Sequence, residues 1–412
     1  MSANKTHFKV LILGAGSGGV SIAARMKKQI NAKEIGIVEP ADFHFYQPLW
    51  TLVGAGVVAK EKTKRPMSAV IPSGVSWVKD SVQSVDASAN KVTCTSGKEI
   101  TYDFLVVATG LKLDWNKIKG LEGNLGKDGI CSIYQFEDAE KTAQMIASFK
   151  GGNAIFTMPP VPIKCAGAPQ KIMYLAEEIF QKNGVRSQSR VNFAVAGKVI
   201  FGVPAFAAPL MKVAERKKID LQFSHKLVEV KAKEHLAIFE KTVETKVDGE
   251  VKTSVERVEQ HYELLHVVPP MSAHDYVSKS NLAFTSGPQT GWLKVDQGTL
   301  QHQDYKNIFG IGDVTGVPNS KTGAAIRKQA PVVAQNLSDV IAGRAPTMKY
   351  DGYSSCPLIT GVGKVILAEF GYDGKLMPSF PMDMTKERRS MWILKKDLLP
   401  PMYWNGMMTG RM

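Results

Sequence analysis

The segment FKVLILGAGSGGVSIAARMKK, residues 8–28, predicts a strand, a glycine-rich loop and a helix in succession. Its first part, residues 8–13, is a short apolar run that predicts a buried strand, and the segment after the glycines predicts a helix. Gly14, Gly16 and Gly19 have the spacing of a dinucleotide-binding loop. The first glycine permits a tight turn, the second lets the backbone approach a pyrophosphate, and the third allows the helix to pack closely on the strand.

A second strand is expected at GIVEP, residues 36–40, and it ends with Glu39, twenty residues after Gly19. A carboxylate at this place can accept hydrogen bonds from ribose hydroxyls. A glycine pattern alone is often a plain turn. Strand, loop, helix and acidic residue in this order predict a dinucleotide site at the start of the chain.

Two later segments, LVVATG at 105–110 and FGIGD at 309–313, each look like a strand that ends in a turn. They resemble the second and third FAD signatures of the two-dinucleotide-binding flavoprotein superfamily. The resemblance implies FAD, with Gly110 beside it and Asp313 on its ribityl chain. Asp313 alone would also suit the N-cap of a helix, but that alternative does not explain three signatures in this order.

The rest of the chain predicts an α/β protein with two Rossmann-like domains and a C-terminal amphipathic, membrane-associating region. A second strand–helix–strand unit is expected over residues 153–196, followed by strands up to residue 268 around a charged hairpin at Asp248-Gly249. The expected boundaries are 1–112 for the first part of the FAD domain, 113–290 for an inserted second domain, 291–345 for the second part of the FAD domain, and 346–412 for the C-terminal region.

The inserted domain lacks the second glycine loop that NAD(P)H-dependent members of this superfamily usually carry. The equivalent segment reads VNFAVAGKVIFGVP, residues 191–204, where Gly197 and Gly202 have no third glycine at the right spacing. No nicotinamide site is therefore expected, and electrons must enter by another route.

Composition excludes several classes of protein. With 44% hydrophobic residues, 22% charged residues and only four cysteines in 412 residues, the chain is neither disordered nor a disulfide-stapled secreted fold. The net charge of +14 favours anionic partners. Residues 1–7 give no secretory signal, and no apolar stretch approaches the roughly 18 residues that span a bilayer. The eight scattered histidines predict no metal site.

Cys165 and Cys356 lie beside prolines in turn-like sequence. Cys165 directly precedes an expected helix, whose N-terminal dipole would stabilise a thiolate, and Lys164 is adjacent. Each cysteine has the alternative role of a small buried hydrophobe. A flavin without NAD needs a local electron donor, however, and this favours a redox role for both.

Five segments resemble sulfide:quinone oxidoreductases, especially the mitochondrial type and its bacterial relatives. They are FHFYQPLWTLVGAG (43–56), KCAGAPQKIMYLAEE (164–178), LLHVVPPM (264–271), FGIGDVTGVPNSKT (309–322) and KYDGYSSCPLITG (349–361). The resemblance implies that Cys165 and Cys356 form a redox pair that sulfide attacks. One cysteine then carries a persulfide, and two electrons pass through FAD to a membrane quinone.

The resemblance also implies contacts and partners. Besides the three loop glycines, the expected FAD contacts are Ser17, Gly18, Glu39, Gln47, Val82, Gly110, Asp313 and Lys321. Lys321 would favour the reduced flavin as a nearby cation, although a solvated lysine at a helix start is the alternative. The partners are hydrogen sulfide, ubiquinone or another membrane quinone, and a small sulfur acceptor such as a thiol, sulfite or a growing polysulfide. Cys131 aligns with a third cysteine of the bacterial branch, and Cys94 is expected to be structural.

The tail, residues 386–412, has six basic and two acidic residues and two apolar clusters, and Pro400-Pro401 is expected to break the helix between them. Interleaved tryptophans, methionines and basic residues are typical of amphipathic membrane anchors. A packed C-terminal helix pair is the alternative. Because a quinone lives in the bilayer, we expect a peripheral protein of the bacterial cell inner membrane or the mitochondrial inner membrane.

Three other functions remain open. A cytochrome-c-coupled sulfide dehydrogenase normally carries an export signal and lacks such a tail. A type II NADH:quinone oxidoreductase shares the flavin signatures but not the two cysteines. A flavin-dependent interaction protein related to apoptosis-inducing factor would use the net charge for nucleic acid. Neither NAD(P)H nor nucleic acid is expected as a partner.

Overall fold

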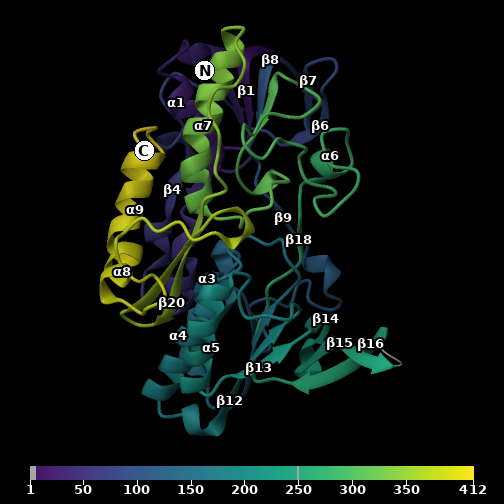
Figure 1. Ribbon diagram of the computed structural model, residues 1–412, viewed down its shortest axis with the longest axis vertical. Coiled ribbons are helices and arrows are strands. Elements are labelled where there is room, and N and C mark those ends of the chain that lie inside the picture. Colours follow the sequence, from purple (N-terminus) through teal and green to yellow (C-terminus); the bar gives the residue numbers. More distant parts are fainter. Residues whose placement is uncertain (1–5, 248–249) are drawn as a thin grey trace.

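The computed structural model describes residues 6–247 and 250–412, so the tip of the expected hairpin at 248–249 lies outside the described residues. A seven-stranded sheet forms the upper half of the molecule in Figure 1, with strand order β5-β2-β1-β8-β7-β6 and β19 paired to β8. Its strands are β1 (His7–Leu13), β2 (Ile35–Val38), β5 (Ser76–Val78), β6 (Val82–Asp86), β7 (Lys91–Cys94), β8 (Glu99–Val107) and β19 (Ile308–Gly310).

The parallel strands of this sheet end at one edge. Leu13 of β1 pairs with Val38 of β2 and Val107 of β8, and Val107 pairs with Gly310 of β19. The glycine loop, Glu39, the turn up to Gly110 and the turn that contains Asp313 each follow one of these ends. Parallel pairing therefore gathers four segments of the sequence at the place where open α/β sheets bind their ligands.

Helix α1 (Ser17–Met26) packs closely behind the glycine loop. A Cβ atom at Gly19 would lie 1.9 Å from the carbonyl oxygen of Gly14, so a side chain cannot be placed there. Gly14 has a φ of +94°, which favours glycine. Helix α7 (Gly323–Ile341) lies beside α1 (Figure 1).

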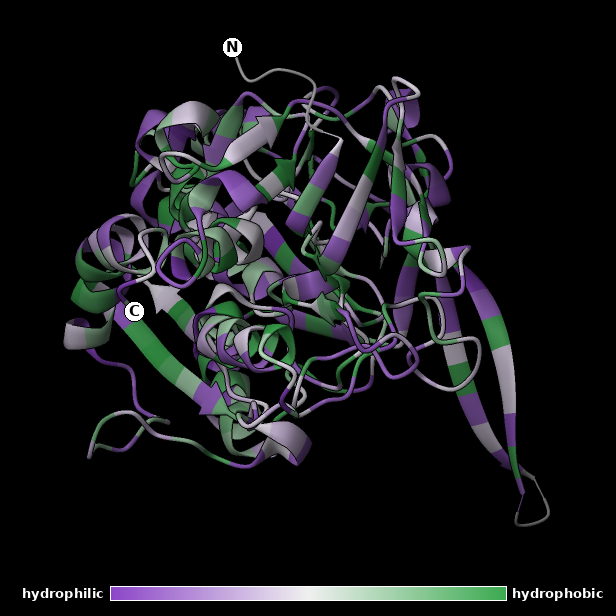
Figure 2. Cartoon of the chain, turned by 90° about the horizontal axis from the view of Figure 1, so that it is seen from above, coloured by the Kyte–Doolittle hydropathy of each residue, from purple (hydrophilic) through white to green (hydrophobic). Residues whose placement is uncertain are grey.

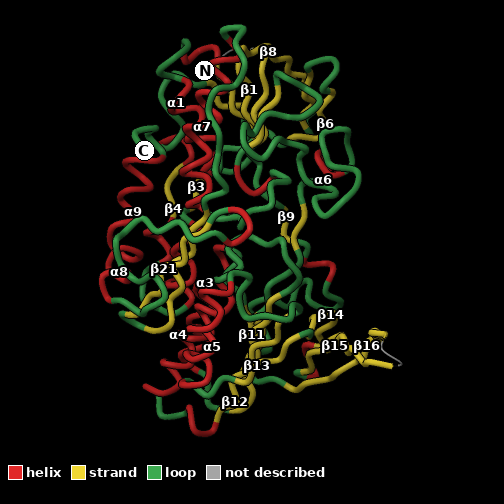
Figure 3. Tube along the Cα trace, in the orientation of Figure 1, coloured by secondary structure: helices red, strands yellow, loops and turns green. Residues whose placement is uncertain are grey.

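A second, fully parallel sheet forms the lower half, with strand order β10-β17-β11-β12-β13. Figure 3 shows α3 (Phe136–Ser148), α4 (Ala168–Lys182) and α5 (Pro204–Arg216) on one side of it. The strands are β10 (Ile130–Cys131), β11 (Gly152–Met158), β12 (Ser189–Val195), β13 (Asp220–Phe223) and β17 (Leu264–His266). The predicted second strand–helix–strand unit is present here as β11, α4 and β12.

Three antiparallel strands lie in the chain between β13 and β17 of the second sheet: β14 (His225–Lys231), β15 (Leu236–Val247) and β16 (Glu250–His261). Figure 2 shows the β15–β16 hairpin extending away from the body of the molecule. Short elements complete the two halves: β3 (Phe43–Phe45), α2 (Trp50–Gly54), β4 (Lys64–Pro66), β9 (Lys112–Leu113), β18 (Met271–Ser272) and α6 (Asp275–Ser278). The α/β prediction is confirmed.

The C-terminal region begins with an antiparallel hairpin, β20 (Ser354–Gly361) and β21 (Lys364–Phe370). The tail is a helical run formed by α8 (Arg389–Ile393), a π-helical segment (Leu394–Leu398), α9 (Leu399–Met402) and a second π-helical segment (Tyr403–Met407). Within the described residues, no helix is long and apolar enough to cross a bilayer.

The tail differs from the sequence-based expectation in two ways. Pro400 and Pro401 do not end the helix, because they fall in the first turn of α9, where no backbone N–H donor is required. The aromatic and methionine side chains of the tail pack into the main core. The buried ones are Met391, Trp392, Tyr403, Trp404, Met407 and Met408. Ile393, Leu398 and Met402 remain exposed, on the other side of the run.

Trp404 tests how much the tail contributes to folding. Its ring is 6% exposed and lies 4.3 Å from the Arg65 guanidinium carbon and 5.0 Å from the Tyr403 ring centroid. We expect Trp404→Ala to lower the free energy of unfolding by about 3–5 kcal/mol in denaturant titration, because it leaves a cavity in the core.

Leu398→Ala is the control, because Leu398 is 50% exposed and should change stability by less than about 0.5 kcal/mol. Equal unfolding free energies for the two variants would contradict the packed arrangement of the tail.

Candidate active site

A cavity of about 830 Å³ opens at the edge where the parallel strands of the first sheet end. It is lined by Gly14, Gly16, Ser17, Gly18, Glu39, Gln47, Val82, Gly110, Cys165, Asp313 and Lys321. These are nearly all of the site residues that the sequence predicts. Gly19 is not part of the wall, because it packs behind the loop, and Cys356 lies just beneath the wall.

Backbone donors hold the Glu39 carboxylate at the cavity. The N–H groups of Ala15 and Ala41 each donate to one of its oxygens, both at 2.8 Å. Gly16 is the N-cap of α1, and a Cβ atom there would meet nothing within 4 Å. The free N–H groups at the start of α1 thus face open space and can bind a phosphate.

Lys321 is fixed inside the protein and is not a solvated helix-start lysine. Its ammonium donates to the carbonyl oxygens of Asp313 at 2.7 Å and Thr315 at 2.9 Å, and it lies 3.9 Å from the Trp292 ring centroid. Burial lowers its pKa to about 8 and raises the pKa of the Asp313 carboxyl. This part of the cavity wall therefore holds a buried cation beside a half-buried acid.

The structure brings Cys165 and Cys356 together. Cys165 precedes α4 with a φ of +48°, a conformation that is uncommon for a residue other than glycine. Its N–H donates to the Lys321 carbonyl oxygen at 2.8 Å. Cys356 lies on β20, and a Cβ atom at Gly167 would lie 2.5 Å from its sulfur. The glycine two residues after Cys165 leaves the space that the second sulfur occupies.

The two thiols have opposite tendencies to ionise. A hydrogen bond from Cys356, assisted by the charges of Lys171 and Lys395, holds the pKa of Cys165 well below its usual range. The same hydrogen bond, together with burial, raises the pKa of Cys356. Together with the Lys171 ammonium 3.5 Å from its sulfur, this hydrogen bond favours ionisation of Cys165 over that of Cys356.

Two buried lysines support this thiolate. The Lys171 ammonium lies 3.5 Å from the Cys165 sulfur, and although burial opposes its charge, the neighbouring sulfurs raise its pKa. Lys395 comes from the tail and donates to the Pro48 carbonyl oxygen at 2.7 Å. Burial lowers the pKa of Lys395 to about 8. A cation that is held this close favours the ionised sulfur.

The sequence did not reveal either lysine as a site residue. Lys171 lies six residues after Cys165 on a predicted helix, a spacing that gives only a weak signal. Lys395 belongs to the basic tail, where charge is typical of a solvated or lipid-facing surface. Lys164, noted only as a neighbour of Cys165, also lines the cavity, and its ammonium donates to Gln47 at 2.9 Å. Burial lowers its pKa to about 8.

The tail also reaches the glycine loop through Tyr403. Burial lowers the pKa of His44 to about 4, so its ring is neutral at physiological pH. Nδ1–H of this ring donates to the Ala15 carbonyl oxygen at 2.8 Å, and Nε2 accepts from the Tyr403 hydroxyl. The Ser17 hydroxyl lies 2.8 Å from the same tyrosine oxygen. Tyr403 thereby ties the tail to the predicted cofactor loop.

The remaining cysteines lie away from the cavity. Cys94 and Cys131 are fully buried, and burial raises the pKa of their thiols to about 11 and about 12. In the inserted domain, the loop that contains Gly197 and Gly202 buries Phe201, which packs edge-on against Phe206 and Phe370.

Residues 8–148 match the pyridine nucleotide-disulphide oxidoreductase family. The mitochondrial sulfide:quinone oxidoreductase of Mus musculus is 44% identical over 409 residues, which cover 98% of this chain and 87% of that protein. The solved structure of the sulfide:quinone oxidoreductase from Aquifex aeolicus has a TM-score of 0.78 at 21% identity and covers 98% of this chain and 92% of that one.

A chain of the mitochondrial ATP synthase of Tetrahymena thermophila has a TM-score of 0.84 at 22% identity, covering 100% of this chain and 98% of that one. At these identities, the two structural matches show a shared fold.

Lys171 offers a test of the thiolate. We expect Lys171→Met to raise the pKa of Cys165, so that less thiolate is present at pH 7 and the whole pH profile of its alkylation shifts upward. The midpoint of the profile should rise by about one pH unit for every 1.4 kcal/mol of charge stabilisation that is lost. The measurement is iodoacetamide labelling of anaerobically reduced protein, read by mass spectrometry of the Cys165 peptide.

Lys182→Met is the matched control, because Lys182 lies at the exposed end of the same helix and should leave the profile unchanged. An unshifted profile in Lys171→Met would mean that Lys171 does not stabilise the thiolate.

Proposed function

The chain belongs to the sulfide:quinone oxidoreductase family, and from this premise we propose that it oxidises hydrogen sulfide at the Cys165–Cys356 pair and delivers two electrons to a quinone. The observation that carries the proposal is the thiolate–thiol pair at the wall of a dinucleotide-sized cavity. Family membership does not favour the cytochrome-c-coupled dehydrogenase or the NADH:quinone oxidoreductase.

The enzyme is an FAD-dependent flavoprotein, and the cavity fits that group. Glu39, fixed by two backbone donors, suits the adenosine ribose, and the open N-terminus of α1 at Gly16 suits the pyrophosphate. Asp313 suits the ribityl chain, and the buried Lys321 provides a cation for the flavin ring. When bound, FAD accepts two electrons from the sulfur pair and passes them to the quinone.

The sulfur chemistry follows from the unequal acidity of the two cysteines. In the oxidised pair, hydrosulfide attacks the Cys356 sulfur, a new S–S bond forms, and the bond to Cys165 breaks. Cys165 is the better leaving group, because the Lys171 ammonium, 3.5 Å from its sulfur, stabilises the thiolate that leaves. Cys356 then carries the persulfide, whose outer sulfur passes to an acceptor such as a thiol, sulfite or polysulfide. Lys171 and Lys395 stabilise the thiolate released at the cavity wall.

The exposed side of the tail is the proposed membrane contact. Ile393, Leu398 and Met402 are 45%, 50% and 37% exposed, in a segment with a local charge of +4. Met402 and its neighbour Leu399 also line the cavity. A lipid-soluble quinone entering at this face would reach the cavity without crossing water. The membrane is the mitochondrial inner membrane or a bacterial inner membrane.

Serine in place of either Cys165 or Cys356 should abolish sulfide-dependent quinone reduction while FAD stays bound, because the cofactor residues lie elsewhere. The measurement is quinone reduction at saturating sulfide, with FAD occupancy taken from the protein-bound absorbance. The control is Cys94→Ser, which lies away from the cavity and should stay close to wild type. More than about a tenth of the activity in both active-site variants would refute the assignment.

The membrane contact is tested by replacing Ile393, Leu398 and Met402 together with serine. We expect loss of binding to anionic liposomes in a flotation assay and slow turnover with a lipid-soluble quinone, because apolar burial in the interface is removed. Sulfide should still bleach the flavin in a single turnover.

The control is the pair Val251→Ser and Val255→Ser, which removes apolar side chains of β16 that are 57% and 63% exposed, more than those of the tail. Full liposome binding by the tail variant would place the membrane contact elsewhere.

A further inference from the structure

The two cysteines are carried by separate parts of the fold. Cys165 lies at the start of α4 in the inserted domain, and Cys356 lies on β20 of the C-terminal hairpin. Helix α4 packs against β20. The distance between the sulfurs therefore depends on how the helix and the strand are held together along their whole length.

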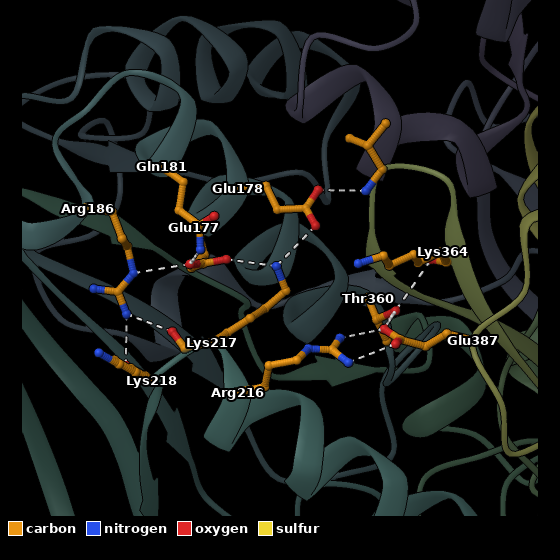
Figure 4. A network of polar contacts seen from close by, with 11 residues as sticks. Glu177, Glu178, Gln181, Arg186, Arg216, Lys217, Lys218, Thr360, Lys364 and Glu387 are labelled. Carbon is orange, nitrogen blue, oxygen red and sulfur yellow. Dashed lines mark hydrogen bonds and ion pairs between the residues drawn. The ribbon is translucent and has the colours of Figure 1, made fainter.

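One attachment lies near the far end of this contact. The Glu178 carboxylate accepts from the N–H of Val362, in the turn of the hairpin, at 2.7 Å and from the Lys217 ammonium at 3.1 Å (Figure 4). A Cβ atom at Gly361 would lie 2.0 Å from the same carboxylate, so this turn closes directly on the helix. With a rise of about 1.5 Å per residue, Glu178 lies roughly 15 Å along α4 from its first turn.

A second attachment joins α5 to the same hairpin. The Arg216 guanidinium makes two hydrogen bonds to Glu387, at 2.9 and 2.8 Å, and the Thr360 hydroxyl of β20 donates to Glu387 at 2.5 Å. Such paired bonds fix direction as well as distance. Figure 4 shows the two attachments side by side between the inserted domain and the hairpin.

Lys217 links the attachments to the interior. It donates to Glu177, which is fully buried, at 2.7 Å, and Arg186 donates to the same carboxylate at 3.3 Å. Each carboxylate of this network is therefore paired with a lysine or an arginine. These ion pairs join the ends of α4 and α5 into one unit.

We propose that Glu178, Lys217, Arg216 and Glu387 form an interdomain clamp that positions Cys356 against Cys165. They are positioning residues, since none of them lines the cavity or contacts either sulfur in the described part of the chain. Without the clamp, β20 is free to move from α4, the sulfurs separate, and the hydrogen bond between them is lost. This proposal rests on the proposed function, because the clamp sets the distance between the two cysteines to which sulfide oxidation is assigned.

The test uses the opposite ionisation of the two thiols as a measure of their contact. In Glu178→Ala holoenzyme, reduced anaerobically and desalted, Cys165 loses a donor, so the midpoint of its alkylation pH profile should rise by about one pH unit. Cys356 no longer donates to a thiolate, so its alkylation should become faster. Lost stability alone would expose both thiols and accelerate both reactions.

The other charged or titratable groups around the pair stay in place in this variant. They are Lys171 on α4, Lys395 in the tail, Tyr134, Lys164 and Asp313. Opposite shifts would therefore report a change in the distance between the sulfurs. Glu178→Gln keeps an acceptor for the Val362 N–H and should give a smaller effect.

Arg216→Lys is the second variant, because Arg216 is half-exposed and its replacement loses only the paired bonds to Glu387. Arg190→Gln, which removes an exposed ion pair with Asp220 in the same domain, is the control and should match wild type. Wild-type alkylation profiles for both cysteines in Glu178→Ala and Arg216→Lys would overturn the clamp. Because sulfide and quinone are absent from the assay, this outcome is separate from failure of the proposed function.

Discussion

The close approach of α4 to β20 is the constraint on which the site depends. Gly167 leaves no side chain between the helix and the strand, and the Cys356 sulfur occupies the space where its Cβ atom would be. The ionisation of the two sulfurs and their positions relative to the cavity both depend on this contact. The contact between the sulfurs favours ionisation of Cys165, which lines the cavity, over that of Cys356, which does not.

Residues of the tail contribute to three parts of the site: the surroundings of the sulfur pair, the glycine loop and the cavity wall. Lys395 places a buried cation near the sulfur pair, Tyr403 bonds to the glycine loop, and Leu399 and Met402 line the cavity. Because buried rings on one side of the run bind it to the core, its exposed apolar side chains are held in a fixed position. A membrane contact on this face would therefore be connected to the site by packed side chains. It would not depend on a loosely attached anchor.

Much of this could be predicted from local sequence. The turn at Gly14, the helix after it and the carboxylate at Glu39 follow from short-range sterics and hydrogen bonding, and parallel pairing then brings Asp313 to the same edge. The cysteine pair came from a family resemblance, since no spacing rule joins residues 191 positions apart. Lys395, the burial of Trp404 and the clamp could not be predicted, because each depends on long-range packing between segments whose own patterns fit a surface equally well.

Entry of electrons through the sulfur pair can be followed by the absorbance of the oxidised flavin when sulfide, and separately NADH, is added to the holoenzyme without oxygen. If electrons enter through Cys165 and Cys356, sulfide bleaches the flavin band within one turnover, NADH leaves it oxidised, and a quinone restores it. Bleaching by NADH but not by sulfide would contradict a role of Cys165 and Cys356 as the entry point, because electrons would then reach the flavin without the sulfur pair.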